Sequence, residues 1–374
     1  MDTIEDSNEP PGSGDTTHPP HKWNDWKWQL KNRITNVQGI TRACGISIPD
    51  AVVSKFPISI TPYYWSLIRQ FDYSDPIFRM CVPSAEEMDD TMFSDPLHEE
   101  EQSPVECLVH RYNDRALLIS TSVCSVYCRY CTRKRTVGMK DEAITGEQLD
   151  KAVEYLKKHP EVEDVIISGG DPLVMSNAWL RWILTAIRAI PSVQVIRIGT
   201  KVPVVLPQRI NESLVKLLSE FHPLYINTHF NHPNEVTPES QRACEMLVNH
   251  GIPVGNQSVL LRGVNDNPQV YEELCRKLIR MRVRPYYLYQ CDLVKGVEHF
   301  RTPIATGLGV MYYLRGRLSG IGIPQFIIDS PGGKGKIPIL PDYVVERTDE
   351  KIVLRNHLGE QVEYPEPKHS EDGL

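Results

Sequence analysis

Seven short apolar runs alternate with amphipathic segments over residues 116–329, and this alternation limits the folds open to the chain. The runs cover residues 116–121, 164–168, 195–200, 225–230, 255–261, 284–289 and 325–329. Continuous apolar runs of this length are typical of parallel strands that are buried on both faces. Between the first two runs, Leu149, Ala152 and Leu156 recur at helical spacing after a capping residue, Thr145. Repeated strand–helix units predict an α/β fold whose parallel sheet winds into a barrel or partial barrel.

Composition and pattern divide the chain into four segments. Residues 1–20 are rich in Pro, Gly, Ser and Thr and predict a disordered tail, because nothing there can form a core. Residues 21–105 show no strand alternation and predict a helical arm. Residues 106–345 hold the strand–helix units, and residues 346–374 predict a small hairpin followed by a loose tail.

Charge and composition exclude several classes of function. The formal net charge is −7, which provides no general attraction to nucleic acid or to membranes. We find neither a long apolar stretch nor a secretory signal pattern, so we expect no membrane span. Nine cysteines without such a signal indicate a reducing compartment, and we expect a cytoplasmic protein without a disulfide framework.

Three of these cysteines, Cys124, Cys128 and Cys131, form a C-x3-C-x2-C run directly after the first predicted strand. Three thiolates can bind three irons of a [4Fe–4S] cluster and leave the fourth iron open for a second ligand. The alternative is a zinc site, but zinc favours four ligands in paired C-x2-C units, and no fourth cysteine is near. The spacing resembles that of the radical S-adenosylmethionine (SAM) enzymes, in which the open iron binds SAM.

The other polar motifs also follow predicted strands. In chain order after the second to the last run they are SGGDP, GTKVP, NHPNE, LRGVND, QCD and DSPGGKGK. In βα barrels the active site lies at the carboxyl ends of the strands. The sequence therefore predicts one active site at this end of the barrel, and the resemblance to radical SAM enzymes implies a partial (β/α)6 barrel.

Gly169, Gly170 and Asp171 follow the second predicted strand. Adjacent glycines permit positive φ and close backbone approach, so they fit a plain strand-to-helix turn as well as a cofactor contact. In radical SAM proteins the matching segment contacts the methionine amino group of SAM. Its place one strand after the cysteines favours the cofactor contact.

Two further groups indicate pyridoxal 5′-phosphate (PLP). The glycine-rich PGGKGK contains Lys334 and Lys336, and a desolvated lysine can bind an aldehyde covalently. Arg111, Tyr112 and Arg115 precede the first strand and can clamp a phosphate, because a guanidinium matches phosphate geometry. The alternatives are a flexible surface turn for the lysines and a solvated loop for the arginines.

Asp292 and Asp329 end two predicted strands that follow each other in the chain. Two adjacent carboxylates are costly to bury without a cation, and a charge-assisted hydrogen bond to an ammonium contributes about 1.5–3 kcal/mol. The pair predicts a substrate with a distal positive charge. Either residue alone could instead cap a helix.

Taken along its length, the chain resembles the lysine 2,3-aminomutase family, radical SAM enzymes that also use PLP. The resemblance runs from about residue 23 to about residue 356 and rests on the motifs DPLHE, HRYNDR, CSVYCRYCTRKR, SGGDPL, NTHFNHPNE, GNQSVLLRGVND and HFRTPI. It implies an exchange of the α-amino group of L-lysine with a β-hydrogen, which yields L-β-lysine. It also implies a homo-oligomer that takes electrons from a flavodoxin or ferredoxin.

By position, the resemblance also implies a role for each candidate residue. These roles are cluster ligation by Cys124, Cys128 and Cys131; covalent PLP binding by Lys336; PLP phosphate binding by Arg111, Tyr112 and Arg115; substrate carboxylate binding by Arg133; ε-ammonium binding by Asp292 and Asp329; a further place in the active site for Asp95; and SAM binding by Gly169, Gly170, Asp171, His229 and Gln257.

Three features depart from the family pattern. The family's PGGGGK is PGGKGK here, and Lys336 rather than Lys334 keeps the register with IPILPDY. Tyr130 stands where the family has histidine. Asn267 replaces a zinc-binding cysteine and no cysteine follows Cys291, so we expect no structural zinc.

Other functions stay open from the sequence. Arginine suits two carboxylates as well as lysine does, so an arginine 2,3-aminomutase is the alternative. A glutamate side chain would be repelled by the aspartates, and a relative that modifies elongation factor P fits the aspartate pair less well. A radical enzyme that consumes SAM without PLP, and a non-catalytic iron–sulfur or zinc scaffold, are the remaining classes.

Overall fold

A nine-stranded sheet forms the centre of the protein in the computed structural model, which describes residues 20–367. Strands β2 to β8 are parallel, and β1 and β9 pair antiparallel at the two edges. The strands are β1 (Leu108–Tyr112), β2 (Arg115–Thr121), β3 (Asp164–Gly169), β4 (Val195–Gly199), β5 (Leu224–Thr228), β6 (Val254–Leu260), β7 (Arg284–Gln290), β8 (Gln325–Asp329) and β9 (Lys336–Pro338). The seven parallel strands coincide with the seven apolar runs, which confirms the predicted fold class.

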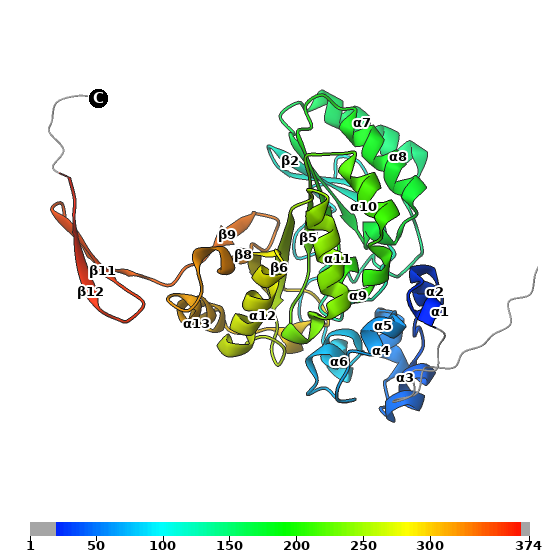
Figure 1. Ribbon diagram of the computed structural model, residues 1–374, viewed down its shortest axis with the longest axis horizontal. Helices are drawn as coiled ribbons and strands as arrows, with labels where there is room; N and C mark the ends of the chain where they lie inside the picture. The colour runs from blue at the N-terminus through cyan, green and yellow to red at the C-terminus, as the bar shows by residue number, and fades with distance from the viewer. Residues whose placement is uncertain (1–19, 368–374) are drawn as a thin grey trace, which may run out of the picture.

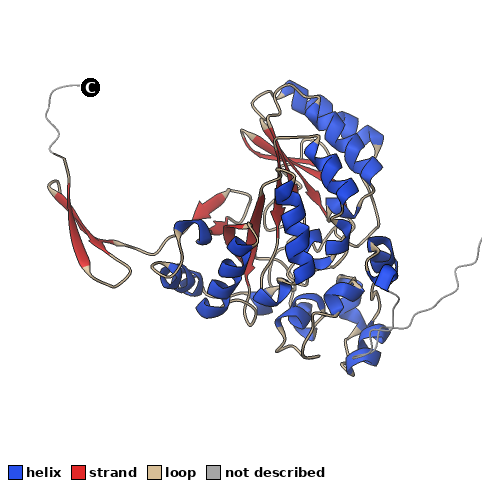
Figure 2. Cartoon of the chain, viewed as in Figure 1, coloured by secondary structure: helices blue, strands red, loops and turns tan. Residues whose placement is uncertain are grey.

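Helices connect the parallel strands and lie on the outer face of the curved sheet (Figure 1, Figure 2). They are α7 (Gly146–Lys158), α8 (Asn177–Arg188), α9 (Val202–Val205), α10 (Glu212–Ser219), α11 (Pro238–Asn249), α12 (Pro268–Arg280) and α13 (Ile304–Leu314). A 3-10 turn, η1 (Ala85–Met88), precedes the sheet, and five others lie between the strands: η2 (Pro172–Val174), η3 (Pro207–Arg209), η4 (Pro233–Glu235), η5 (Glu298–Phe300) and η6 (Gly320–Gly322). The six strand–helix units from β2 to α13, followed by β8, make a partial (β/α)6 barrel.

Local sequence signals explain where these helices begin. Thr145 and Gln148 form a capping box at the start of α7, in which each side chain accepts a hydrogen bond from the other residue's backbone amide. Thr237 caps α11, and Pro238 occupies the first helical position, where it sacrifices no intrahelical hydrogen bond. The cap that the sequence predicts at Thr145 is confirmed.

Side chains alternate between two environments along each barrel strand. In β3, Val165 and Ile167 are fully buried under the outer helices, whereas Ile166 and Ser168 are half-buried and face an internal cavity. Val165 pairs with Ala116 of β2 and with Ile196 of β4, so this layer continues around the barrel. The predicted burial on both faces therefore holds only in part, because one face lines the cavity.

A helical arm precedes the barrel and packs across the carboxyl ends of its strands (Figure 1). Its helices are α1 (Pro20–Trp23), α2 (Trp26–Lys31), α3 (Val37–Cys44), α4 (Asp50–Lys55), α5 (Pro62–Trp65) and α6 (Pro76–Cys81). The Thr61 hydroxyl donates a hydrogen bond of 2.6 Å to the carbonyl oxygen of Val205 in α9. The backbone carbonyl of Ser59 accepts from the amide of Tyr127 at 2.9 Å, which ties the arm to the cysteine loop.

The end of the chain forms a separate antiparallel sheet that projects away from the barrel (Figure 1). Its strands are β10 (Val344–Arg347), β11 (Lys351–Arg355) and β12 (Gln361–Pro365). The sequence predicts only a hairpin here, and the structure adds β10 as a third strand. The disordered tail predicted for residues 1–20 and the loose tail predicted at the C-terminus fall almost entirely outside the described residues. The division of the chain into four segments stays a prediction.

No helix within residues 20–367 is long and apolar enough to cross a membrane. All nine cysteines are free thiols.

Candidate active site

The loop after β2 carries the three cysteines beneath the helical arm. Cys124, Cys128 and Cys131 are half-buried, and a guanidinium nitrogen of Arg33 donates to the backbone carbonyl of Cys124 at 3.0 Å. Burial raises the pKa of the Cys131 thiol to about 11. Thiolates at this depth need a compensating positive charge, which iron supplies when it binds.

A buried ion pair holds this loop against the arm. Arg129 is fully buried, and its Nε and Nη2 donate to the two carboxylate oxygens of Glu87 at 2.9 and 2.7 Å. Lys134 donates to the same carboxylate at 2.9 Å. Although burial raises the pKa of Glu87, the two cations outweigh this effect and lower it below the usual value. Glu87 thus stays ionised and fixes the loop from both sides of Cys131.

The two glycines after β3 lie against the start of the cysteine loop. Gly169 has φ of +124°, and a Cβ on it would meet the Thr121 carbonyl oxygen at 2.4 Å. A Cβ on Gly170 would lie 2.4 Å from the carbonyl oxygen of Val123. Asp171 donates its backbone amide to that same oxygen at 2.8 Å. Close approach to the cysteine-bearing segment therefore explains both glycines, whatever else they contact.

Asp171 itself has a structural role. Its carboxylate accepts hydrogen bonds from the Thr200 hydroxyl at 2.6 Å and from the Lys201 amide at 2.7 Å, and it caps η2. Burial raises its pKa to about 6, although these bonds act in the opposite direction. The cap satisfies the acceptor atoms of Asp171 within the protein.

A cavity of about 760 Å³ fills the inside of the barrel. Eight of the predicted site residues line it: Arg111, Tyr112, Arg115, Arg133, His229, Gln257, Asp329 and Lys336. The other predicted residues, which are Asp95, Gly169, Gly170, Asp171, Asp292 and the three cysteines, are not part of its lining. The volume lies within the range that suits a cofactor together with a small ligand.

Lys336 opens β9 and points to the cavity, whereas Lys334 is exposed. The Lys336 Nζ lies 2.6 Å from Asp329 Oδ2, and the Lys336 amide donates to the Tyr112 hydroxyl at 2.9 Å. Gly335 has φ of +96°, a conformation that favours glycine, and a Cβ on it would lie 3.3 Å from that hydroxyl. The register that the sequence favours for Lys336 agrees with this arrangement.

The segment before β2 is not a loop, as one sequence interpretation allowed, but the edge strand β1. Its Arg111 donates to Gln102 Oε1 at 2.6 Å and to the Leu97 carbonyl at 2.7 Å, and it lies 3.4 Å from Asp329. The Arg115 guanidinium stacks 3.9 Å from the centre of the Tyr112 ring. Two guanidinium groups and one phenol thus meet beside Lys336, as a phosphate clamp requires.

Asp292 lies between the cysteine loop and the Lys336–Asp329 pair. Its carboxylate accepts a hydrogen bond of 2.7 Å from the hydroxyl of Thr132, the residue after Cys131. Burial, together with the nearby charge of Asp329, raises the pKa of Asp292 to about 6. A cationic neighbour would stabilise the ionised form of a carboxyl group whose pKa is raised in this way.

Arg133 already has an anionic partner in the cavity wall. Its Nη2 and Nε donate to the Glu99 carboxylate at 2.6 and 2.9 Å. Burial alone would raise the pKa of Glu99, but Arg133 and Arg135 bring it down to about 2. Asp95 pairs with Arg135 at 3.1 Å, and its other oxygen is buried without a hydrogen bond in the described structure. The third guanidinium nitrogen of Arg133, Nη1, donates to no described residue.

His229 and Gln257 share one wall of the cavity. The His229 Nδ1 lies 2.9 Å from the backbone carbonyl of Gln257 and therefore carries a proton. Burial and the nearby Lys201 lower the pKa of His229 to about 4, so the ring is neutral near pH 7. Its position is compatible with a neutral hydrogen-bonding role toward a ligand.

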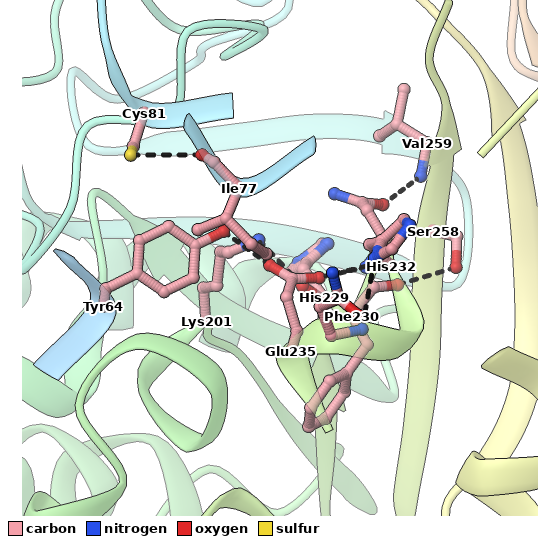
Figure 3. A network of polar contacts seen from close by, with 12 residues as sticks. Tyr64, Ile77, Cys81, Lys201, His229, Phe230, His232, Glu235, Ser258 and Val259 are labelled. Atoms are coloured by element: carbon pink, nitrogen blue, oxygen red, sulfur yellow. Dashed lines mark hydrogen bonds and ion pairs between the residues drawn. The ribbon is translucent and has the colours of Figure 1, made fainter. Parts of the chain in front are cut away.

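A network of buried polar side chains lies behind the cysteine loop (Figure 3). Lys201 Nζ donates to Glu235 Oε1 at 2.8 Å, and the Tyr64 hydroxyl donates to the same oxygen at 2.7 Å. Lys201 also donates to the hydroxyl of Tyr130 at 3.0 Å. The network joins the arm, the loop after β4 and the loop after β5.

Sequence reasoning missed Glu99, Gln102, Lys201, Glu235 and Tyr289. Tyr289 lies in β7 two residues after Tyr287, and both rings line the cavity; the strand period of two indicates their common face. The Lys336 ammonium lies 5.6 Å from the centre of the Tyr289 ring. The roles of Glu99 and Glu235 had no such signal, because each depends on a partner distant in the sequence.

The residues in place fit the groups that the sequence predicts. Three half-buried free thiols, a lysine beside a guanidinium pair and a cavity of sufficient volume suit a cluster, PLP and a ligand. Within residues 20–367 no group of three or more His, Cys, Asp or Glu side chains is placed to hold one metal ion. In a cubane cluster three thiolates bind three separate irons and do not converge on one ion.

A three-cysteine loop at the carboxyl end of the first strand of a (β/α)6 partial barrel defines the radical SAM class of proteins. In agreement, the model of the Radical SAM superfamily matches residues 118–274. A second model, described as Lysine-2,3-aminomutase, matches residues 311–373.

The chain belongs to the lysine 2,3-aminomutase family, which confirms the resemblance seen in its motifs. It is 48% identical to the L-lysine 2,3-aminomutase of Clostridium subterminale over 92% of this chain and 85% of that protein. It is 49% identical to that of Acetoanaerobium sticklandii over 93% of this chain and 86% of that protein. It is 40% identical to the glutamate 2,3-aminomutase of Clostridioides difficile over 91% of this chain and 82% of that protein.

Proposed function

We propose that the protein interconverts L-lysine and L-β-lysine by moving the amino group between C2 and C3, with a [4Fe–4S] cluster, SAM and PLP. It is thus an isomerase, a lysine 2,3-aminomutase. The observation that carries the choice of substrate is the contact of 2.6 Å between the Lys336 ammonium and the Asp329 carboxylate inside the cavity.

The Lys336 side chain ends in the same alkylammonium as free lysine. Its ion pair with Asp329 is therefore a stand-in for the ε-ammonium of the substrate. If Lys336 held PLP, its nitrogen would not be available to Asp329 as a free ammonium when the substrate enters, and the ε-ammonium of lysine would take that place. Asp292, whose pKa burial and Asp329 raise to about 6, gains from the same cation. A substrate with a distal positive charge thus removes the cost of two adjacent carboxylates.

Arg133 binds the carboxylate at the other end of the substrate. Glu99 holds its Nε and Nη2 and fixes the plane of the guanidinium, so that Nη1 is oriented before a ligand arrives. A group that is held in place in advance loses less entropy when it binds.

Lys336 holds PLP, and Arg111, Tyr112 and Arg115 bind its phosphate. When bound, PLP supplies an electron sink next to the migrating nitrogen. Cys124, Cys128 and Cys131 hold the cluster, which together with SAM supplies abstraction of hydrogen from an unactivated carbon. His229, Gln257 and the Gly169–Asp171 turn would contact SAM. The barrel wall and the helical arm exclude water, which would otherwise quench such chemistry.

An anaerobic assay tests the proposal. The full chain, reconstituted with iron, sulfide and PLP, receives SAM, a reductant and lysine, arginine or glutamate in parallel. We expect β-lysine from lysine and little product from glutamate, which two carboxylates repel. Turnover of arginine without turnover of lysine would contradict the substrate, and consumption of SAM without any PLP requirement would contradict the reaction class.

A variant links the assay to the aspartate pair. Asp292→Asn removes one charge-assisted hydrogen bond of about 1.5–3 kcal/mol, so we expect kcat/KM for lysine to fall about 10- to 100-fold. Asp349→Asn, in the exposed turn between β10 and β11, is the matched control and should not change it. An unchanged kcat/KM in Asp292→Asn would remove Asp292 from the substrate site.

The partners and the compartment are part of the same proposal. The cluster takes electrons from a flavodoxin or ferredoxin, and nine free cysteines suit the reducing cytoplasm. We also propose a homo-oligomer. Support comes from the projecting sheet β10–β12, which exposes Val344, Val345, Val362 and Tyr364.

A further inference from the structure

Gln102 lies in a turn ahead of β1, and its side-chain amide bridges two parts of the site. Its Oε1 accepts a hydrogen bond of 2.6 Å from Arg111 Nε, and its Nε2 donates to the backbone carbonyl of Gly333 at 3.1 Å. Arg111 lines the cavity, and Gly333 belongs to the glycine-rich loop that leads to Lys336. Gln102 is not part of the cavity lining, so it acts on a ligand through these neighbours.

The chemistry of the two neighbours fixes the orientation of the Gln102 amide. A guanidinium has donors only, so Arg111 must face the amide oxygen, and a backbone carbonyl has no donor, so Gly333 must face the amide nitrogen. A carboxylate in this place would set an acceptor against the Gly333 carbonyl. An apolar side chain would leave both groups without this partner. The bridge therefore requires an amide.

The bridge also leaves the charge of Arg111 available. Uncharged oxygens hold its Nε and Nη2, namely the Gln102 amide oxygen and the Leu97 carbonyl at 2.7 Å. Its Nη1 lies 3.4 Å from the Asp329 carboxylate, a longer contact. Arg133, by contrast, is held by a carboxylate at 2.6 Å. Three N–H groups of Arg111 thus have acceptors among residues 20–367, and the others remain for a ligand.

The glycine-rich loop is fitted closely against the segment that contains Gln102. The Gly332 amide donates to the Pro96 carbonyl at 2.9 Å. Gly333 has φ of +67°, and a Cβ on it would lie 2.4 Å from Nε2 of Gln102. One side chain therefore joins the cavity arginine to the loop that carries Lys336.

We propose that Gln102 is a positioning residue for PLP, which holds the charged Arg111 guanidinium toward the phosphate of the cofactor. A group that is fixed in advance loses less entropy when it binds. A charge-assisted hydrogen bond to phosphate is also stronger than a neutral one. The proposal rests on the proposed function in that Lys336 holds PLP and Arg111 binds its phosphate.

The test compares PLP with pyridoxal, which has the same aldehyde but no phosphate. The reconstituted full chain is equilibrated with either compound, without SAM or lysine, and then reduced with borohydride. Mass spectrometry gives the fraction of Lys336 that carries the reduced adduct. In Gln102→Met we expect the half-saturating concentration of PLP to rise about 10- to 100-fold. That of pyridoxal should rise less than about twofold, since the Gly332–Pro96 hydrogen bond still holds the loop.

Arg111→Met shows whether Gln102 acts through Arg111. By itself this substitution should weaken the binding of PLP and spare that of pyridoxal. Added to it, Gln102→Met should have little further effect on the half-saturating concentration of PLP, because the two residues act as a unit. Full additivity of the two substitutions would overturn the proposal, since Gln102 would then act independently of Arg111.

Gln241→Met is the matched control. It makes the same change on the exposed face of α11, where Gln241 donates to Glu245 at 2.8 Å, and it should alter neither concentration. If Gln102→Met does not fold, Gln102→Glu takes its place. It retains a polar side chain, but its carboxylate neutralises Arg111 and should weaken PLP selectively. In the variant that folds, an equal rise for PLP and pyridoxal, or no rise for either, would overturn the proposal.

The wild type separates this result from the proposed function. A wild type that forms no adduct at Lys336 would contradict the proposed function itself. A wild type that binds PLP at Lys336 and forms β-lysine, while Gln102→Met keeps the same preference for PLP over pyridoxal, would remove only the inference.

Discussion

Lys336 differs from Lys334 in its surroundings rather than in its chemistry. Lys336 faces the cavity beside Tyr112 and Asp329, whereas Lys334 is exposed. We expect Lys336→Ala to abolish the visible absorbance of lysine-bound PLP that borohydride removes. Lys334→Ala is the control and should retain it. Loss of the absorbance in Lys334→Ala alone would show that the register of this segment is wrong.

The protonation of Asp292 predicts a pH dependence. Its pKa is raised to about 6 by burial and by Asp329, so the neutral fraction grows as the pH falls through 6. Neutral Asp292 cannot balance an ammonium, and kcat/KM for lysine should therefore fall toward acid pH. We expect the ratio of kcat/KM between wild type and Asp292→Asn to drop between about pH 7.5 and pH 5. A ratio that is constant over this window would exclude the assignment.

For single residues, the sequence predicted which side chains line the cavity better than it predicted which residues they pair with. Lys336, Arg111 and Arg133 were each expected in the site and line the cavity, because their motifs follow or precede strand ends. The Glu99 carboxylate that holds Arg133 lies 34 residues away along the chain. No local pattern reports a pair that only the tertiary fold brings together.

At the scale of elements, the turn η1 and the cysteine loop are joined by one carboxylate. Glu87 is buried between Arg129 and Lys134, and removal of a partner from a buried ion pair costs about 3–5 kcal/mol. We expect Glu87→Gln to lower the midpoint of thermal unfolding and the iron content after reconstitution. Glu86→Gln, its exposed neighbour, is the control. Equal iron content and equal midpoints in the two variants would show that this ion pair does not hold the loop.

The parallel strands were predictable, but the edge strands were not. Each of β2 to β8 is a short apolar run, because its outer face is buried under helices. The edge strand β1 ends in polar residues that belong to the site, and β9 spans only Lys336–Pro338. Their strand conformation comes from pairing with β2 and β8 rather than from their own pattern.

For the whole molecule, the sheet β10–β12 is separate from the barrel sheet and projects away from it. Its exposed apolar side chains suit contact with a second copy. We expect light scattering after size exclusion to give the full chain a molar mass above that of a monomer. A chain that ends at residue 340 should form particles with fewer subunits. A monomeric full chain would contradict the proposed homo-oligomer.

The central claim is that the amino group migrates within a single lysine molecule bound in the cavity. The most direct measurement offers the reconstituted enzyme a mixture of lysine labelled with both ¹⁵N at the α-amino group and ¹³C at C3, and unlabelled lysine, and examines the product by nuclear magnetic resonance. The account predicts β-lysine in which ¹⁵N is bonded to the ¹³C-labelled C3, with no exchange between labelled and unlabelled molecules. Scrambled label, or no β-lysine from an enzyme with a complete cluster and PLP, would contradict it.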